Sequence, residues 1–131
     1  MNSMKAFVAA RVAGEDKETL LMFLSGVKQA LQKAGIEPYI TELEPPQPDD
    51  GKKLLRAFAH IDESDVLIVI YKPGPASEGM SAEVGYAYGR KPVWIYAQDG
   101  SESNLFALAD RVSTWGSDDE LFHSLQESKN E

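Results

Sequence analysis

The most constraining feature of the sequence is a continuous apolar run, DVLIVIY, from Asp65 to Tyr71. The five residues after Asp65 are all valine, leucine or isoleucine. A strand with one face in water alternates apolar and polar residues, whereas a parallel strand covered on both faces is apolar throughout. The run therefore predicts a central strand of a parallel sheet with helices packed against both faces.

Strand-like and helix-like segments alternate on either side of this run. Apolar segments at 4–10, 36–40, 92–97 and 111–114 predict further strands, and residues between them show helical spacing of apolar positions. Such alternation implies parallel strands joined by right-handed crossovers. We predict an α/β fold over residues 1–131, a single domain with a flavodoxin-like (Rossmann-like), doubly wound, five-stranded parallel sheet and helices on both faces.

Composition and charge restrict the classes of function. The 131 residues are 43% hydrophobic and 26% charged, as in soluble globular domains, and no apolar run reaches the roughly 18 residues of a membrane span. The net charge of −8 disfavours a nucleic acid polymer as partner but is compatible with a small anion. The absence of cysteine and of a signal-peptide pattern favours a cytoplasmic protein.

Metal and cofactor motifs are also missing from the sequence. The two histidines, His60 and His123, are far apart and there is no cysteine, so no metal-ligand spacing is present. Neither G-x-x-x-x-G-K-[ST] nor G-x-G-x-x-G occurs. We expect no metal and no cofactor.

The helix expected over residues 78–90 carries the most informative carboxylate. If Ser77 is its N-cap, Glu83 stands in the second turn, where its side chain leans back over Gly79. Glycine in a helix costs about 1 kcal/mol relative to alanine, which indicates that space is needed there. The positive helix end favours an ionised Glu83. A solvated glutamate beside a closely packed glycine is the alternative.

This part of the chain resembles a known family. Residues 64–96, SDVLIVIYKPGPASEGMSAEVGYAYGRKPVWIY, resemble the signature of the nucleoside 2-deoxyribosyltransferases, which include the 2-deoxynucleoside 5'-monophosphate N-glycosidases. The shared pattern is an apolar strand opened by Asp, a Pro/Ser loop, then Gly and Glu-x-Gly-[Tyr/Phe]-Ala before a Lys-Pro strand. The resemblance implies cleavage or transfer of the N-glycosidic bond of a 2-deoxynucleoside or its 5'-monophosphate.

The resemblance also implies roles for single residues. Glu83 matches the catalytic carboxylate that attacks the anomeric carbon, as in a retaining glycosidase. Ser77 matches a serine that holds a sugar hydroxyl or a 5'-phosphate, although capping the helix is an equal explanation. Gly79 and Gly85 match glycines beside the implied pocket. Tyr86 follows Glu-x-Gly, and core packing explains it equally well.

One departure from the family pattern concerns the remaining catalytic machinery. The family has a catalytic Asp eight residues before the position of Asp65, and Ala57 stands there. Asp49 and Asp50 are the best-placed substitutes, with helix capping as the alternative, whereas Asp62 and Asp65 belong at the other end of the sheet. The loss of the Asp keeps a second function open, a non-catalytic module that binds a nucleotide or nucleoside derivative.

Arg11 and Asn104 complete the predicted substrate site. Arg11 follows the first strand and is a candidate phosphate or carboxylate partner, or an ordinary surface arginine. Family active sites are completed by a residue of the adjacent subunit, which implies Asn104 in a homodimer or larger homo-oligomer; the alternative for Asn104 is a helix N-cap. Apolar residues in excess of what one sheet face can cover favour such an assembly, namely Tyr88, Leu105, Phe106 and Leu108.

Overall fold

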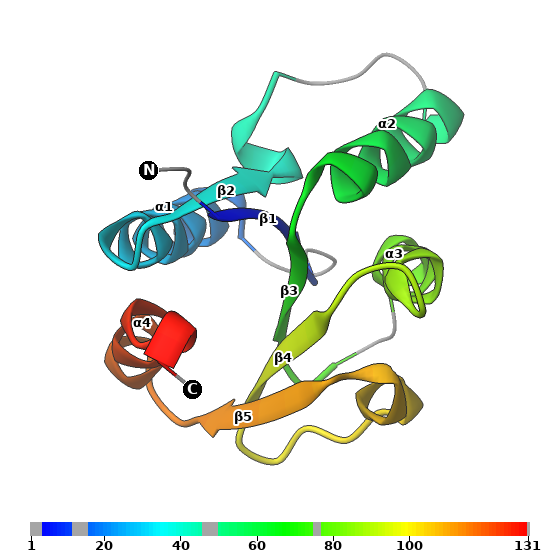
Figure 1. The fold of residues 1–131 in the computed structure, drawn as a ribbon. Coiled ribbons are helices and arrows are strands. Elements are labelled where there is room, and N and C mark those ends of the chain that lie inside the picture. The colour runs from blue at the N-terminus through cyan, green and yellow to red at the C-terminus, as the bar shows by residue number, and fades with distance from the viewer. Residues whose placement is uncertain (1–3, 12–15, 46–49, 75–76, 131) are drawn as a thin grey trace.

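The computed structural model describes residues 4–11, 16–45, 50–74 and 77–130. Strands, α-helices and short 3₁₀ helices (η) follow one another along these residues (Figure 1). Their bounds are β1 Met4–Ala10, α1 Lys17–Lys33, β2 Ile36–Ile40, η1 Thr41–Leu43, α2 Asp50–Glu63, β3 Val66–Tyr71, α3 Glu78–Ala87, β4 Val93–Gln98, η2 Asn104–Leu108, β5 Arg111–Trp115, α4 Asp118–Gln126 and η3 Ser128–Asn130.

The strands form one five-stranded sheet with the order β2-β1-β3-β4-β5, and every pairing is parallel. This is the flavodoxin-like order, in which the chain first winds outward from β1 to β2 and then crosses back to β3. The strand order reverses between β1 and β3. The predicted fold class is confirmed.

The apolar run that predicted a central strand forms β3, and both of its faces are covered. Alternate residues enter two separate cores: Ile68 and Ile70 pack on the α1/α4 side, and Leu67 and Val69 on the α2/α3 side. All four are at most 1% exposed. Figure 1 shows α1 and α4 on one face of the sheet and α2 and α3 on the other. Burying each such side chain contributes about 2 kcal/mol, so β3 anchors both layers.

Helix α3 begins where the sequence predicted and ends earlier. Ser77 caps it, and the Ser77 Oγ accepts a hydrogen bond of 3.2 Å from the Met80 N–H. Met80, Val84 and Ala87 are buried against the sheet, as their spacing predicted. The helix was expected to reach Arg90 but stops at Ala87, and Gly89 then has a φ of +81°, a conformation that glycine adopts without a steric penalty.

Candidate active site

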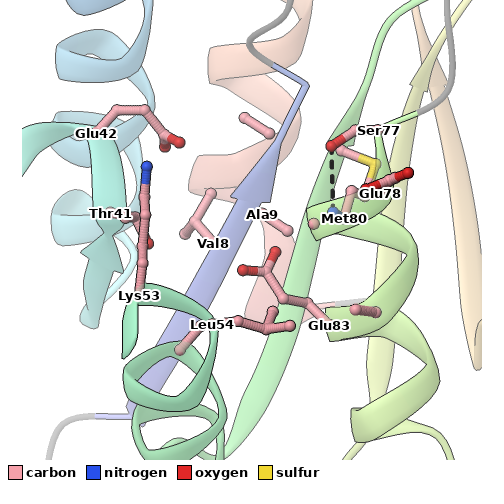
Figure 2. Close-up of a pocket in the computed structure, with 14 residues that line it drawn as sticks. Val8, Ala9, Thr41, Glu42, Lys53, Leu54, Ser77, Glu78, Met80 and Glu83 are labelled. Carbon is pink, nitrogen blue, oxygen red and sulfur yellow. Dashed lines mark hydrogen bonds between the residues drawn. The ribbon is translucent and has the colours of Figure 1, made fainter. Parts of the chain in front are cut away.

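A cavity of about 520 Å³ opens at the carboxyl end of the sheet, beside the point where the strand order reverses. Its walls come from the end of β1, from η1, from α2 and from the start of α3 (Figure 2). Pockets of roughly 300–1,000 Å³ accommodate drug-sized ligands, and doubly wound sheets bind their ligands at this edge. The cavity therefore has the size and the place expected for a nucleoside site.

Glu83 projects into this cavity from the second turn of α3 (Figure 2). Gly79, one turn earlier, lines the same cavity. A Cβ built on Gly79 would meet only the Ser77 Oγ at 3.9 Å, an ordinary contact. Close packing therefore does not require a glycine at this position, and the space beside Glu83 is open.

The pKa of Glu83 is raised to about 7. Burial is the largest cause, the negative charge of Glu42 adds to it, and the positive charge of Lys53 acts in the opposite direction. The expectation that the helix end keeps this carboxyl readily ionised was wrong, because loss of hydration outweighs the favourable charges. Glu83 therefore exchanges its proton near neutral pH.

Glu42 is a site residue that the sequence pattern did not reveal. It lies in η1, directly after β2, is half-buried and lines the cavity. Burial raises its pKa, while its own backbone N–H and Lys53 act to lower it. Figure 2 shows Lys53 extending from α2 with its amino group toward Glu42. The available signal was its position in the loop that follows a strand at the ligand edge.

Arg11 and Asn104 meet at a second cavity of about 250 Å³ rather than beside Glu83. Ser77 lines both cavities and so stands between them. The Arg11 Nη2 donates a hydrogen bond of 2.9 Å to the Pro73 carbonyl oxygen. The alternative of Asn104 as a helix cap is wrong, because Ser103 caps η2 and accepts a hydrogen bond from the backbone N–H that follows Asn104.

The sequence pattern of the nucleoside 2-deoxyribosyltransferase family matches residues 13–125. The chain belongs to this family. No curated protein sequence gives a significant match.

Solved structures of three proteins share the fold of this family member. A conserved protein from Enterococcus faecalis V583 has a TM-score of 0.67 at 17% identity, covering 97% of this chain and 99% of its own. A 2-deoxyribosyltransferase from Bacillus psychrosaccharolyticus has a TM-score of 0.66 at 20% identity, covering 90% of each chain. A CMP N-glycosidase from Clostridium botulinum has a TM-score of 0.66 at 16% identity, covering 92% and 97%. At such identities the likeness concerns the fold.

The departure from the nucleoside 2-deoxyribosyltransferase pattern lies on the cavity wall. Ala57, where the resemblance implied an Asp, is 5% exposed and lines the large cavity from α2. Asp49, one proposed substitute, lies outside the described residues, and Asp50 is the first residue of α2. The wall at Ala57 therefore offers a methyl group where the family resemblance implied a carboxyl.

Tyr86 is not among the residues that line the two cavities. Its hydroxyl donates to the carboxylate of Asp62 at 2.7–2.8 Å, and its ring stacks on Phe58 with 4.2 Å between the ring centres. The guanidinium of Arg90 covers the ring at 4.5 Å. These contacts favour the packing role that the sequence left open. Asp65 likewise accepts a hydrogen bond of 2.8 Å from the Lys5 N–H, as a strand-entry residue does.

The described part of the chain holds neither a metal-ligand cluster nor a membrane-spanning helix. No three histidine, cysteine, aspartate or glutamate side chains among these residues come together in a way that could hold a metal ion. None of the described helices is long and apolar enough to cross a membrane.

Proposed function

We propose that this protein cleaves or transfers the N-glycosidic bond of a 2-deoxynucleoside or its 5'-monophosphate, with Glu83 as the nucleophile. Proteins of its family act on the N-glycosidic bond of nucleosides or nucleotides. The observation that carries the proposal is the half-buried carboxyl of Glu83, directed into a cavity of nucleoside size at the ligand edge of the sheet.

The reaction proceeds in two displacements at the anomeric carbon. The ionised carboxylate of Glu83 attacks this carbon through an oxocarbenium-like transition state, while the bond to the base breaks and its electron pair leaves with the base. The product is a glycosyl ester of Glu83. A water molecule or a second base then attacks the same carbon and releases Glu83 as a carboxylate. The final acceptor decides between hydrolysis and transfer.

The neighbouring groups at the start of α3 position the sugar. The Ser77 hydroxyl and the backbone around Gly79 border the large cavity, where a helix start suits a sugar hydroxyl or a phosphate. Arg11 and Asn104 border the smaller cavity on the other side of Ser77. In this assignment the large cavity holds the nucleoside and the small one its 5' end. Asp49 and Tyr86 stay sequence predictions without structural support.

We propose further that the protein works as a homodimer or larger homo-oligomer, as one cytoplasmic domain without a cofactor. Of the apolar residues expected to be in excess, those of η2 pack partly against the α2/α3 core, whereas Tyr88 is 58% exposed. Leu55 of the neighbouring helix α2 is 67% exposed. A symmetric contact would bury both. Size-exclusion chromatography with light scattering tests this, and a strict monomer at micromolar concentration contradicts it.

The activity is tested with a panel of 2-deoxynucleosides and their 5'-monophosphates, with ribonucleosides as controls. Release of free base indicates hydrolysis, and exchange with an added base indicates transfer. Saturable binding without turnover favours the second function, a non-catalytic binding module. The methyl group of Ala57, in place of a catalytic carboxyl, is compatible with such a module. The absence of both binding and turnover on the whole panel contradicts the proposal.

A further inference from the structure

We infer that Glu42 is the second catalytic carboxyl of this site, giving a proton to the departing base and then taking one from the incoming water or acceptor base. The inference rests on the proposed function.

The reaction itself requires a second proton-handling group. A departing nucleobase gathers negative charge on the nitrogen that held the sugar, and general acid catalysis of such a step contributes roughly 10²- to 10⁴-fold. Glu83 cannot supply this proton while it attacks as a carboxylate. The position of the family's Asp carries only the methyl group of Ala57. The proton then has to come from another group at the cavity.

Few ionisable side chains line this cavity among the described residues. They are Glu42, Lys53, Glu78 and Glu83. Lys53 and Glu78 are exposed, and Glu78 also belongs to the same helix as Glu83. Glu42 is the half-buried group that comes from another element. Apart from the nucleophile Glu83, Glu42 is therefore the one carboxyl of these four side chains that is partly shielded from water.

The two carboxyl groups approach the cavity from different walls. Glu83 comes from α3, Glu42 from η1 after β2, and the end of β1 with Val8 and Ala9 lies between them (Figure 2). A substrate seated over β1 would have the nucleophile on one side and the acid on the other. The small side chain of Ala57 leaves room on the α2 wall of the cavity.

The charges around the pair favour one shared proton near neutral pH. Burial raises the pKa of both carboxyls, and the negative charge of Glu42 further raises the pKa of Glu83. The reactive arrangement has Glu83 ionised and the proton on Glu42, which is the less populated of the two singly protonated forms, because the negative charge of Glu42 favours the proton on Glu83. Among the described residues, the charged or titratable groups around Glu42 are Glu83 on α3, Lys53 on α2, Tyr39 on β2 and Glu44 after η1, and Glu78 of α3 lines the same cavity.

A pH profile separates this role from a structural one. If Glu42 must be protonated, kcat of the wild-type enzyme falls at high pH and the profile is bell-shaped. In Glu42→Gln the basic limb disappears, because no proton is left to lose. If Glu83 acts alone, activity of the wild type simply rises with pH through about 7.

Leaving-group dependence provides the second readout. The substrates are 2'-deoxyuridine and its 5-fluoro derivative, or their 5'-monophosphates if only these react, and the fluorinated base departs more easily without a proton. We expect Glu42→Gln to lower kcat by roughly 10²-fold or more for the unsubstituted base and much less for the fluorinated one. The matched control is Glu44→Gln, an exposed carboxyl just beyond η1 that does not line the cavity. It keeps wild-type rates on both substrates.

Glu42→Asp keeps the experiment decisive if the glutamine variant is unstable. It retains a carboxyl group, so a slower enzyme with its basic limb present supports the inference. Equal losses on both bases, or a basic limb that persists in Glu42→Gln, overturn the role of Glu42 and leave the proposed function standing. Absence of base release by the wild-type protein from every substrate overturns the proposed function itself, and the inference falls with it.

Discussion

Helices α2 and α3 lie on the same face of the sheet (Figure 1). The polar groups at their two ends have different surroundings. At the ligand end, Glu83 and Lys53 border an open cavity together with Glu42. At the other end, the Tyr86 hydroxyl bonds to Asp62 and the aromatic rings stack. We call the end of α2 and α3 that borders the cavity the open end, and the end with the Tyr86–Asp62 hydrogen bond the closed end.

This difference indicates that polar contacts at the closed end serve packing, whereas the carboxyls at the open end are suited to reaction. At the closed end the polar groups have partners and remain near water. At the open end burial raises the pKa of two carboxyls, so ionising them opposes folding. Strongly shifted pKa values in a cavity are typical of functional sites.

The largest expected effect is on activity at the open end. Glu83→Gln should lower base release by roughly 10³-fold or more, because an amide is a very poor nucleophile at carbon. Circular dichroism should show an unchanged fold. Glu63→Gln changes an exposed carboxyl at the closed end and should keep full activity. A Glu83→Gln rate within about tenfold of wild type would remove Glu83 from the mechanism.

The same substitution should change the pH dependence of stability. The folded-state pKa of Glu83, about 7, lies above its ordinary value of 4.5, so the folded protein binds more protons between these pH values. The wild type therefore loses free energy of unfolding as pH rises through this window and stays lower above it. Glutamine does not ionise. The free energy of unfolding of Glu83→Gln should therefore exceed that of the wild type by up to about 3 kcal/mol at alkaline pH.

Urea unfolding at about pH 4 and about pH 8 measures this gain. The advantage of Glu83→Gln over wild type should be greater at the higher pH, whereas Glu63→Gln should show no comparable change. An advantage that is the same at both pH values would mean that Glu83 ionises as easily in the folded protein as in the unfolded chain.

A glycine pair on α3 offers a sharper contrast between the two ends. Gly79 borders the cavity, and a Cβ added to Gly85 would meet nothing within 4 Å, so both positions have room for alanine. Each change to alanine should stabilise the helix by up to about 1 kcal/mol. Only Gly79→Ala should lower kcat/KM, because its methyl group enters the space beside Glu83. Equal activity of both variants would mean that substrate does not use this space.

The smallest expected effect belongs to the closed end. Tyr86→Phe removes the hydrogen bond to Asp62 but keeps the ring stacked on Phe58. We expect a slight decrease in thermal stability and unchanged kcat and KM. An increase in KM without loss of stability would instead support the substrate-binding role that the family resemblance implied for Tyr86.

Local patterns were sufficient to predict the fold and one side of the site. The apolar run of β3 specified a strand covered on both faces, since that pattern depends only on neighbouring residues. The spacing from Ser77 through Gly79 to Glu83 placed the carboxyl over the start of α3, because helix geometry relates residues one turn apart.

The tertiary structure alone decided the other side of the site and its electrostatics. Glu42 faces Glu83 only because β2 and β3 flank β1 in the sheet, although 41 positions separate the two carboxyls in the sequence. Tyr86 meets Asp62 across two helices for the same reason. The pKa of Glu83 was expected in the wrong direction from the helix start. Every group that folding packs against a carboxyl removes part of its hydration. The sequence alone does not show which groups these are.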